Sequence, residues 1–213
     1  MTLRLTVLAS GRGSNFVALH DAIQSGRCDA QIVSVVTDNK SAPVIQLAEA
    51  RDITTQIVPF RKKDRAAWEA ELLDFVQAQE AEWVVLAGFM RVLSASFVDA
   101  FSQRILNVHP SLLPAFPGMH AVQQALDAGV RLSGCTVHLV DAGVDTGPVL
   151  AQAAVPVCEG DDADALHGRI RKREHTLLAS TIDALAAGRL ELDPVRWNAA
   201  SWPESIESPM SLP

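Results

Sequence analysis

Residues 3–20 read Leu-Arg-Leu-Thr-Val-Leu-Ala-Ser-Gly-Arg-Gly-Ser-Asn-Phe-Val-Ala-Leu-His. Residues 3–9 form a short apolar run typical of a buried strand, and the apolar residues from Phe16 onward open a helical segment. The glycines between the two segments allow the chain to turn sharply. A strand, a glycine turn and a helix in this order form the first unit of a fold in which helices connect parallel strands.

The same alternation continues along the chain. Near-continuous apolar runs such as residues 83–87 are typical of parallel strands covered on both faces of a sheet. Residues 64–79 have the apolar spacing of an amphipathic helix, and another helix is expected to begin near Asp161. The pattern predicts an α/β fold with an open, doubly wound sheet. The expected strands are residues 3–9, 31–37, 54–59, 83–87, 104–109, 135–141 and 150–157.

Residues 1–188 contain no segment with the composition of a linker, so we predict that they form one domain. Proline and serine recur in residues 189–213, which are therefore predicted to be an irregular C-terminal tail.

Composition excludes several classes of protein. Hydrophobic residues make up 48% of the 213 residues, which is enough for a packed core and argues against a disordered chain. The net charge of −7 argues against a nucleic-acid partner, and no apolar stretch approaches the roughly 18 residues of a membrane span. Cys28, Cys135 and Cys158 form no CxxC pair and are expected to be buried thiols in a reducing compartment, which predicts a cytoplasmic protein.

The glycine turn has the features of an anion site. Backbone N–H groups at the start of a helix face an anion well, and Ser14 and Asn15 are suitable helix N-caps. Phe16 occupies the position of the third glycine in a dinucleotide-binding motif, and a P-loop lysine is missing, so a single phosphate is the favoured ligand. The alternative is a capped turn without a ligand.

Residues 104–110 read Arg-Ile-Leu-Asn-Val-His-Pro and carry the clearest chemical signal. Asn107 and His109 share one face of the predicted strand, and Pro110 is expected to end the strand directly after them. Ligands of open α/β sheets bind at this carboxyl edge. An amide and an imidazole together can donate two hydrogen bonds to an oxyanion, although a histidine that is simply satisfied in the core is the alternative.

Residues 141–148, Asp-Ala-Gly-Val-Asp-Thr-Gly-Pro, predict a shaped turn that presents Asp141 and Asp145. A carboxylate beside His109 would favour the charged imidazolium, whereas an Asx-turn is the alternative for Asp145. His138 is expected to have a structural role. The run 169–175 is typical of a solvated helix face, with one or two phosphate contacts as the alternative. No His, Cys and carboxylate spacing suggests a metal site.

Four segments together resemble the folate-dependent phosphoribosylglycinamide formyltransferases. They are residues 8–15 (Leu-Ala-Ser-Gly-Arg-Gly-Ser-Asn), 85–93 (Val-Leu-Ala-Gly-Phe-Met-Arg-Val-Leu), 107–114 (Asn-Val-His-Pro-Ser-Leu-Leu-Pro) and 144–149 (Val-Asp-Thr-Gly-Pro-Val). The resemblance covers about residues 3–188 and makes residues 1–188 a formyltransferase domain. It implies a mostly parallel seven-stranded sheet whose sixth strand, near residues 134–141, is antiparallel.

The resemblance also implies roles for single residues. It implies that 10-formyltetrahydrofolate gives its formyl group to the amine of glycinamide ribonucleotide, with no metal, in a monomer or homodimer. The implied catalytic residues are Asn107, His109 and Asp145. Gly13, Ser14, Asn15 and Glu174 match the ribonucleotide site, and Arg65, Met90, Arg91, Val92, Leu93, Asn107 and Asp141 match the formylfolate site. Because both ligands are anionic, Arg65 and Arg91 are expected to supply local positive charge.

The chain departs from the family pattern at two places, and three rival functions are disfavoured. Val122 stands where family members often carry a second histidine, and the tail matches no pattern. A methionyl-tRNA formyltransferase would be expected to carry a further, basic C-terminal domain. A formyltetrahydrofolate hydrolase would be expected to carry an N-terminal regulatory domain. A non-catalytic ligand-binding protein of this fold is disfavoured because Asn107, His109 and Asp145 are all present.

Overall fold

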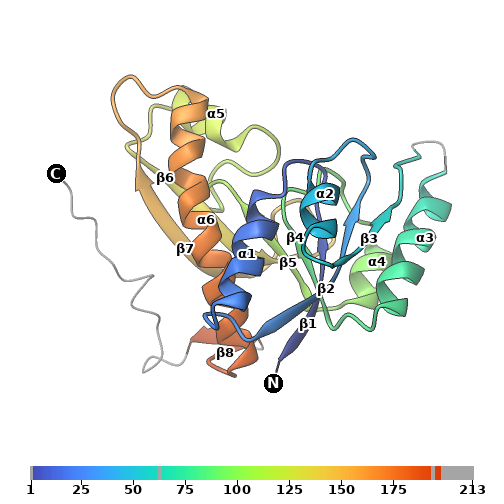
Figure 1. Ribbon diagram of the computed structural model, residues 1–213. Helices are drawn as coiled ribbons and strands as arrows, with labels where there is room; N and C mark the ends of the chain where they lie inside the picture. The colour runs from blue at the N-terminus through green and yellow to red at the C-terminus, as the bar shows by residue number, and fades with distance from the viewer. Residues whose placement is uncertain (1, 62–63, 193–194, 198–213) are drawn as a thin grey trace.

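The computed structural model describes residues 2–61, 64–192 and 195–197. Seven strands form one sheet in the order β3-β2-β1-β4-β5-β6-β7, flanked by helices (Figure 1). The strands are β1 (Leu3–Leu8), β2 (Ala30–Thr37), β3 (Thr54–Ile57), β4 (Trp83–Leu86), β5 (Ile105–His109), β6 (Leu132–Leu139) and β7 (Val149–Pro156). All seven coincide with the expected strands to within a few residues, and β5 ends directly before Pro110 as predicted.

The pairing confirms the direction of the strands. β1 pairs in parallel with β2 and β4, β2 with β3, and β4 with β5, whereas β6 is antiparallel to both β5 and β7. The antiparallel sixth strand, which the resemblance implied, is thus confirmed. The carboxyl ends of β1, β4 and β5 consequently lie at one edge of the sheet, where ligands of such sheets bind.

The helices cover both faces of the sheet. They are α1 (Ser14–Gln24), α2 (Val44–Glu49), α3 (Arg65–Ala78), α4 (Ala95–Ala100), α5 (Ala121–Asp127) and α6 (Ala163–Ala186). Successive residues of one strand point to opposite faces of the sheet. Val7 belongs to the core cluster with α1 and α6, and Leu8 belongs to the core cluster with α3 and α4 on the other face. α6 lies beside α1 and contacts β6 and β7, so it spans the half of the sheet that contains the antiparallel strand (Figure 1).

The C-terminal segment contains a short hairpin. β8 (Leu190–Leu192) and β9 (Val195–Trp197) pair antiparallel in a separate two-stranded sheet, within the stretch predicted to be an irregular tail. Residues 193–194 and 198–213 of that stretch lie outside the described residues. Leu190 is buried and packs against the core cluster that contains α6, so the chain continues past residue 188 as part of the packed structure.

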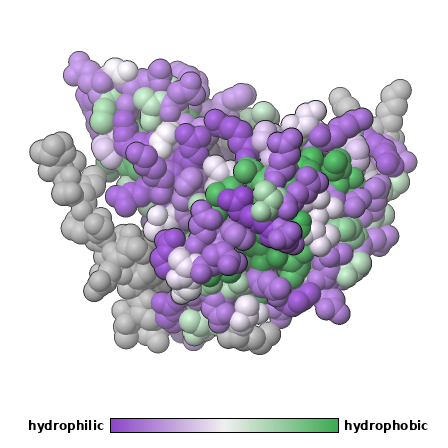
Figure 2. All heavy atoms as spheres, in the orientation of Figure 1, coloured by the Kyte–Doolittle hydropathy of each residue, from purple (hydrophilic) through white to green (hydrophobic). Residues whose placement is uncertain are grey.

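The cysteines and the surface complete the fold. Cys28 and Cys135 are buried as expected, but Cys158 is exposed because it lies in the turn between β7 and α6, so the expectation of three buried thiols was wrong. No helix of the described residues is both long and apolar enough to span a membrane. The face shown in Figure 2 is mostly hydrophilic, with hydrophobic residues gathered near its centre.

Candidate active site

A cleft of about 770 Å³ opens at the carboxyl edge of the sheet. Its walls come from the glycine turn after β1, residues 86–93 after β4, residues 107–110 at the end of β5, the loop and first turn at 118–123, the turn after β6 and the N-terminal half of α6. All three implied catalytic residues line this cleft. The topology therefore joins segments that are far apart in sequence into one site.

His109 and Asp145 form an ion pair within the cleft. The Nδ1 atom of His109 lies 3.3 Å from Oδ2 of Asp145, and its Nε2 atom lies 2.9 Å from the carbonyl oxygen of Phe116. Both ring nitrogens thus face oxygen acceptors, and a doubly protonated imidazolium can donate to both. The same Oδ2 accepts a 2.7 Å hydrogen bond from the N–H of Gly118, which connects Asp145 to the loop after β5.

Asn107 is held by two partners. Its Nδ2 atom lies 3.1 Å from Nε2 of His138 and donates a longer, 3.4 Å hydrogen bond to Oδ1 of Asp145. The Nδ1 atom of His138 lies 2.9 Å from the carbonyl oxygen of Leu139. Because a carbonyl oxygen can only accept a hydrogen bond, Nδ1 is the nitrogen that carries the proton. With its proton on Nδ1, His138 accepts at Nε2, and this fixes the Asn107 amide with its NH₂ group toward the histidine.

The surroundings of Asp145 favour its ionised form. Burial acts to raise the pKa of Asp145, but hydrogen bonds and charges from its neighbours, the Gly118 N–H and His109 among them, outweigh burial and hold it below its usual value. Asp145 adopts a left-handed backbone conformation, with φ of 56°. Its carboxylate bonds to a residue of a different loop rather than to its own turn, so the Asx-turn alternative does not apply to it.

That alternative applies to Asp141. Its Oδ1 accepts hydrogen bonds from the Gly143 N–H, at 3.0 Å, and from the Thr146 hydroxyl, at 2.7 Å. Asp141 lines the cleft, but its carboxylate is used to shape the turn that presents Asp145. Its role toward a formylfolate stays a prediction.

The glycine turn differs from expectation at its cap. Gly13 is the N-cap of α1, with φ of 75° and no side-chain cap, so the expectation that Ser14 or Asn15 caps the helix was wrong. A Cβ atom at Gly13 would lie 2.6 Å from a methyl carbon of Val44, which shows how closely the turn approaches α2. The residue is therefore confined to glycine by both conformation and space.

Asn15 instead connects α1 to α6. Its Nδ2 atom donates a 3.1 Å hydrogen bond to Oε2 of Glu174, and both side chains are buried. Burial raises the pKa of Glu174, although the bond from Asn15 and the nearby Arg171 act in the opposite direction. The Oδ1 atom of Asn15 is buried without a hydrogen-bond partner among the described residues. All four residues of the implied ribonucleotide site line the cleft.

The residues implied for formylfolate divide into two groups. Met90, Arg91, Val92 and Leu93 line the cleft, and the side chains of Met90 and Val92 are exposed. Arg65 lies outside it: its guanidinium donates to the Val92 carbonyl at 2.7 Å and pairs with Glu69. It lines a separate hollow between α3 and α4.

Arg91 was expected to supply local positive charge to the site, and in the structure this charge is paired with a carboxylate. The Nε atom of Arg91 lies 2.6 Å from the buried carboxylate of Asp38, and its guanidinium lies 4.2 Å from the centre of the Phe60 ring. Asp38 directly follows β2, so only the sheet order brings it to Arg91. The charge of Arg91 is largely compensated within the protein.

Sequence reasoning underrated His138. It lies directly opposite Asn107 in the antiparallel register of β5 and β6, so the pairing of the strands places it in the site. A polar residue in a buried strand was the available signal. Within residues 2–61, 64–192 and 195–197, no group of three or more His, Cys, Asp or Glu side chains is arranged to hold a metal ion.

Known proteins match this chain over most of its length. The family model described as formyl transferase matches residues 3–182. Phosphoribosylglycinamide formyltransferase of Mycobacterium tuberculosis is 46% identical over 185 residues, which cover 86% of this chain and 85% of the relative. The Bacillus subtilis enzyme of the same name is 41% identical, covering 85% of this chain and 94% of the relative.

A solved structure agrees with the same assignment. Glycinamide ribonucleotide transformylase 1 from Symbiobacterium toebii superposes with a TM-score of 0.87 at 41% identity, covering 92% of this chain and 94% of the other. The sheet with one antiparallel strand, the cleft at its carboxyl edge and the match over residues 3–182 agree. The chain belongs to the formyl transferase family.

Proposed function

We propose that this protein transfers the formyl group of 10-formyltetrahydrofolate to the amine of glycinamide ribonucleotide, giving formylglycinamide ribonucleotide and tetrahydrofolate for purine biosynthesis. The observation that carries the proposal is one cleft that holds both the Asn107–His109–Asp145 group and the glycine turn. A phosphorylated amine can reach the catalytic group with its phosphate at the turn. The relatives named above support the same substrates.

The cleft also suits a flat, partly apolar co-substrate. Met90, Val92 and Val144 are large apolar side chains that remain exposed, and all three line the cleft. Exposed apolar side chains gathered in a concave site are typical of a ligand-binding surface. We propose that they contact the pterin of the formylfolate, with Leu93 behind them and Asp141 closing the turn. Arg65 supports the Val92 backbone in this arrangement.

The reaction begins with attack of the ribonucleotide amine on the formyl carbon. A C–N bond forms, and the electron pair of the carbonyl moves to oxygen as an oxyanion. Protonated His109 and the Asn107 amide donate hydrogen bonds to this oxyanion, which stabilises it more than the initial carbonyl. Because His109 now donates to Phe116 and Asn107 to Asp145, each of these bonds is exchanged for one to the substrate.

Proton transfer completes the exchange. The attacking amine loses a proton, the N10 nitrogen of the folate gains one, and the bond between N10 and the formyl carbon breaks as the carbonyl reforms. Asp145, held ionised, keeps His109 charged and accepts or relays the amine proton within the cleft. Holding both substrates in one cleft adds the advantage of proximity.

A single assay tests the proposal. The protein is supplied with 10-formyltetrahydrofolate and either glycinamide ribonucleotide, initiator methionyl-tRNA or no acceptor, and tetrahydrofolate is measured. We expect turnover that depends on the ribonucleotide. Equal turnover without an acceptor would assign a hydrolase instead, and dependence on the tRNA would assign a different transferase.

We also propose that the protein works in the cytoplasm as a monomer or homodimer, on small molecules and without a nucleic-acid partner. Cys28 and Cys135 are unpaired thiols, which suits a reducing compartment. Burial raises the pKa of Cys28 to about 12, so this thiol stays protonated and unreactive. We propose that residues 1–188 form the catalytic domain and that residues 189–213 are a C-terminal segment appended to it, of which Leu190 packs against the domain.

A further inference from the structure

The segment that joins β4 to α4, residues 87–94, forms one wall of the cleft without regular secondary structure. Met90 and Val92, two of the exposed apolar side chains that meet the pterin in the proposed function, belong to it. Among the described residues, none of the backbone N–H groups of this segment donates to a carbonyl oxygen within it. The conformation of the wall is therefore set by groups outside the segment.

Asp38 holds the segment from the side of β2. Its side chain is 1% exposed, and its Oδ2 atom accepts a 2.6 Å hydrogen bond from Nε of Arg91. The N–H of Phe60, whose ring lies against the Arg91 guanidinium, donates to the Asp38 carbonyl oxygen at 3.4 Å. The other carboxylate oxygen, Oδ1, is buried without a hydrogen-bond partner among the described residues. A buried carboxylate that is satisfied on one side adds little to stability, so we expect its contribution in the orientation of Arg91.

Glu69 holds the other end of the segment from α3. Its side chain is 10% exposed, and its Oε1 atom accepts a 2.7 Å hydrogen bond from the N–H of Ser94. The same oxygen lies 3.5 Å from the guanidinium of Arg65, which donates to the Val92 carbonyl oxygen at 2.7 Å. Glu69 thus contacts the segment once directly and once through Arg65.

The glycine turn contacts the segment through neutral groups only. The N–H of Ser10 donates to the Gly88 carbonyl oxygen at 3.1 Å, and the Ser10 hydroxyl oxygen accepts the N–H of Met90 at 2.9 Å. Hydrogen bonds with an ionised partner are roughly twice as strong as bonds between neutral groups. The two carboxylates therefore make the strongest of these contacts.

We propose that Asp38 and Glu69 are positioning residues for the folate co-substrate, whose carboxylates hold residues 87–94 in the conformation that binds the pterin. The inference rests on the proposed function, because it takes the formylfolate as the ligand of this wall. Neither carboxylate lines the cleft, so each acts through the segment. Loss of either carboxylate is expected to weaken folate binding and to leave ribonucleotide binding unchanged.

The test measures binding without catalysis. Titration calorimetry uses tetrahydrofolate, tetrahydropteroate, which has the same pterin and aminobenzoate groups but no glutamate tail, and glycinamide ribonucleotide. We expect Asp38→Ala and Glu69→Ala to weaken binding of both pterin ligands about tenfold, as for loss of a hydrogen bond to a charged group. The Kd for the ribonucleotide is expected to change less than about twofold. Asp38→Asn and Glu69→Gln retain an acceptor oxygen, so their loss is expected to be only about threefold.

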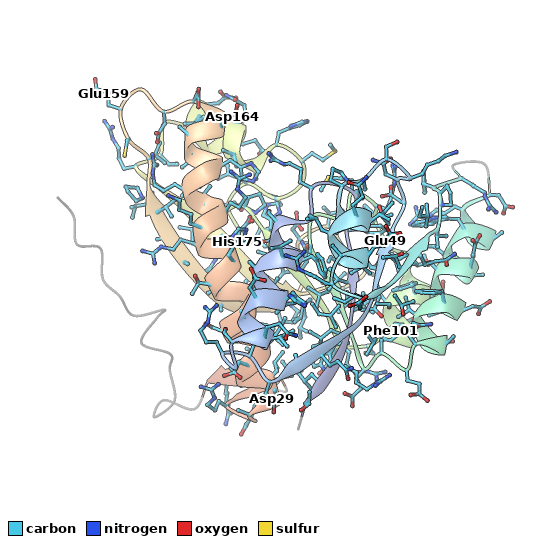
Figure 3. The ribbon with its side chains drawn as sticks, viewed as in Figure 1. Asp29, Glu49, Phe101, Glu159, Asp164 and His175 are labelled. Carbon is cyan, nitrogen blue, oxygen red and sulfur yellow. The ribbon has the colours of Figure 1, made fainter. Side chains whose placement is uncertain are left out.

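A control variant separates this effect from loss of any buried ion pair. Asp183 also pairs with an arginine, Arg189, and accepts the N–H of Asp29 at 3.0 Å. Asp29 lies at the opposite end of α6 from Asp164, which lines the cleft (Figure 3). Asp183→Ala is therefore expected to leave the Kd of all three ligands unchanged. Circular dichroism establishes folding, and the amide variants keep the side-chain volume and test the proposal even if an alanine variant is unstable.

Three results would overturn the inference. The first is a Kd for tetrahydrofolate within twofold of the wild-type value in folded Asp38→Ala or Glu69→Ala. The second is a loss for tetrahydrofolate that is absent for tetrahydropteroate, because the carboxylates would then act on the glutamate tail and not on the pterin wall. The third is an equal loss of ribonucleotide binding, or amide variants that bind no better than the alanine variants.

The proposed function fails in a different way. If both pterin ligands bind with the expected dependence on Asp38 and Glu69 but no formyl group reaches the ribonucleotide, the proposed reaction is wrong and the positioning role stands. If formyl transfer is normal and the variants bind both pterin ligands as tightly as the wild type, the reaction stands and the positioning role is wrong.

Discussion

Asp145 and His109 lie 3.3 Å apart across the cleft, and the same carboxylate oxygen of Asp145 accepts the Gly118 N–H at 2.7 Å. One oxygen atom thus connects the end of β5, the loop that follows it and the turn after β6. Its other oxygen faces Asn107 and His138. The Asp145 carboxylate thus contacts both of the other implied catalytic residues as well as His138 and Gly118.

Asp145→Asn is therefore expected to reduce kcat by about 10²–10⁴, the usual range for loss of a positioned proton-transfer group. An amide presents only one oxygen, so the substituted side chain would turn its NH₂ group either toward the Gly118 and His109 donors or toward the Asn107 amide. Steady-state kinetics at saturating concentrations of both substrates measures the loss. A folded variant with more than a tenth of wild-type kcat would contradict the assigned role.

Asn107→Ala is expected to reduce kcat by about 10²–10³, as for other single oxyanion donors. KM for either substrate should change little, because the bond to the oxyanion forms only in the transition state. The measurement is a kcat and KM comparison, with circular dichroism to confirm folding. A loss that appears only in KM would indicate that Asn107 binds the ground state.

His138 is expected to act through Asn107 as a positioning residue. His138→Ala removes the acceptor that orients the amide, which is worth one hydrogen bond and predicts a loss in kcat of about tenfold. His138→Gln retains an acceptor and should recover part of this loss. If both variants raise KM while kcat is unchanged, or if the glutamine gives no recovery, the positioning role is wrong.

The strands and the site differ in how far they could be predicted. Buried strands such as β4 are continuous apolar runs that neighbouring turns delimit, so their positions were readable from local pattern. The direction of β6 was not, because an apolar strand has the same composition whether it pairs parallel or antiparallel. It came only from the resemblance.

The misjudged residues share one cause, which is a partner distant in sequence. Arg91 meets Asp38, 53 residues away, and Asn107 meets His138 across the sheet. Neither pair can be deduced without the strand order and register. The cap of α1 was misjudged for a local reason: Ser14 has the chemistry of a cap, but only Gly13 accepts the left-handed conformation that the turn requires.

The glycine turn allows a comparison of two glycines in one loop. Gly13→Ala is expected to destabilise the protein by about 1–3 kcal/mol, because alanine is strained at φ of 75° and its Cβ meets Val44. Gly11 has open space around it, so Gly11→Ala should change stability by less than about 0.5 kcal/mol. Urea unfolding measures both variants. If Gly13→Ala lost no more stability than Gly11→Ala, the close approach of the alanine Cβ atom to Val44 would be relieved without cost, and the prediction would be wrong.

Glu174→Gln is expected to stabilise the fold while it weakens binding of the ribonucleotide. Burial raises the pKa of Glu174 above its unfolded value, so the folded state holds the proton more tightly and wild-type stability falls as the pH rises through that value. Glutamine has no charge to bury and can still accept the Asn15 hydrogen bond, so its urea midpoint should exceed that of the wild type at pH 7.5.

This difference should shrink toward zero as the pH falls below the ordinary glutamate range, where the wild-type carboxyl is protonated in both states. Glu191→Gln, on exposed β8, is the control for loss of a surface charge and should show no such pH dependence. KM for glycinamide ribonucleotide should rise in Glu174→Gln, because an uncharged amide oxygen is a weaker hydrogen-bond acceptor for the ribonucleotide than a carboxylate. A midpoint difference that is the same at pH 4 and pH 7.5 would show that the buried carboxyl is not the source of the gain.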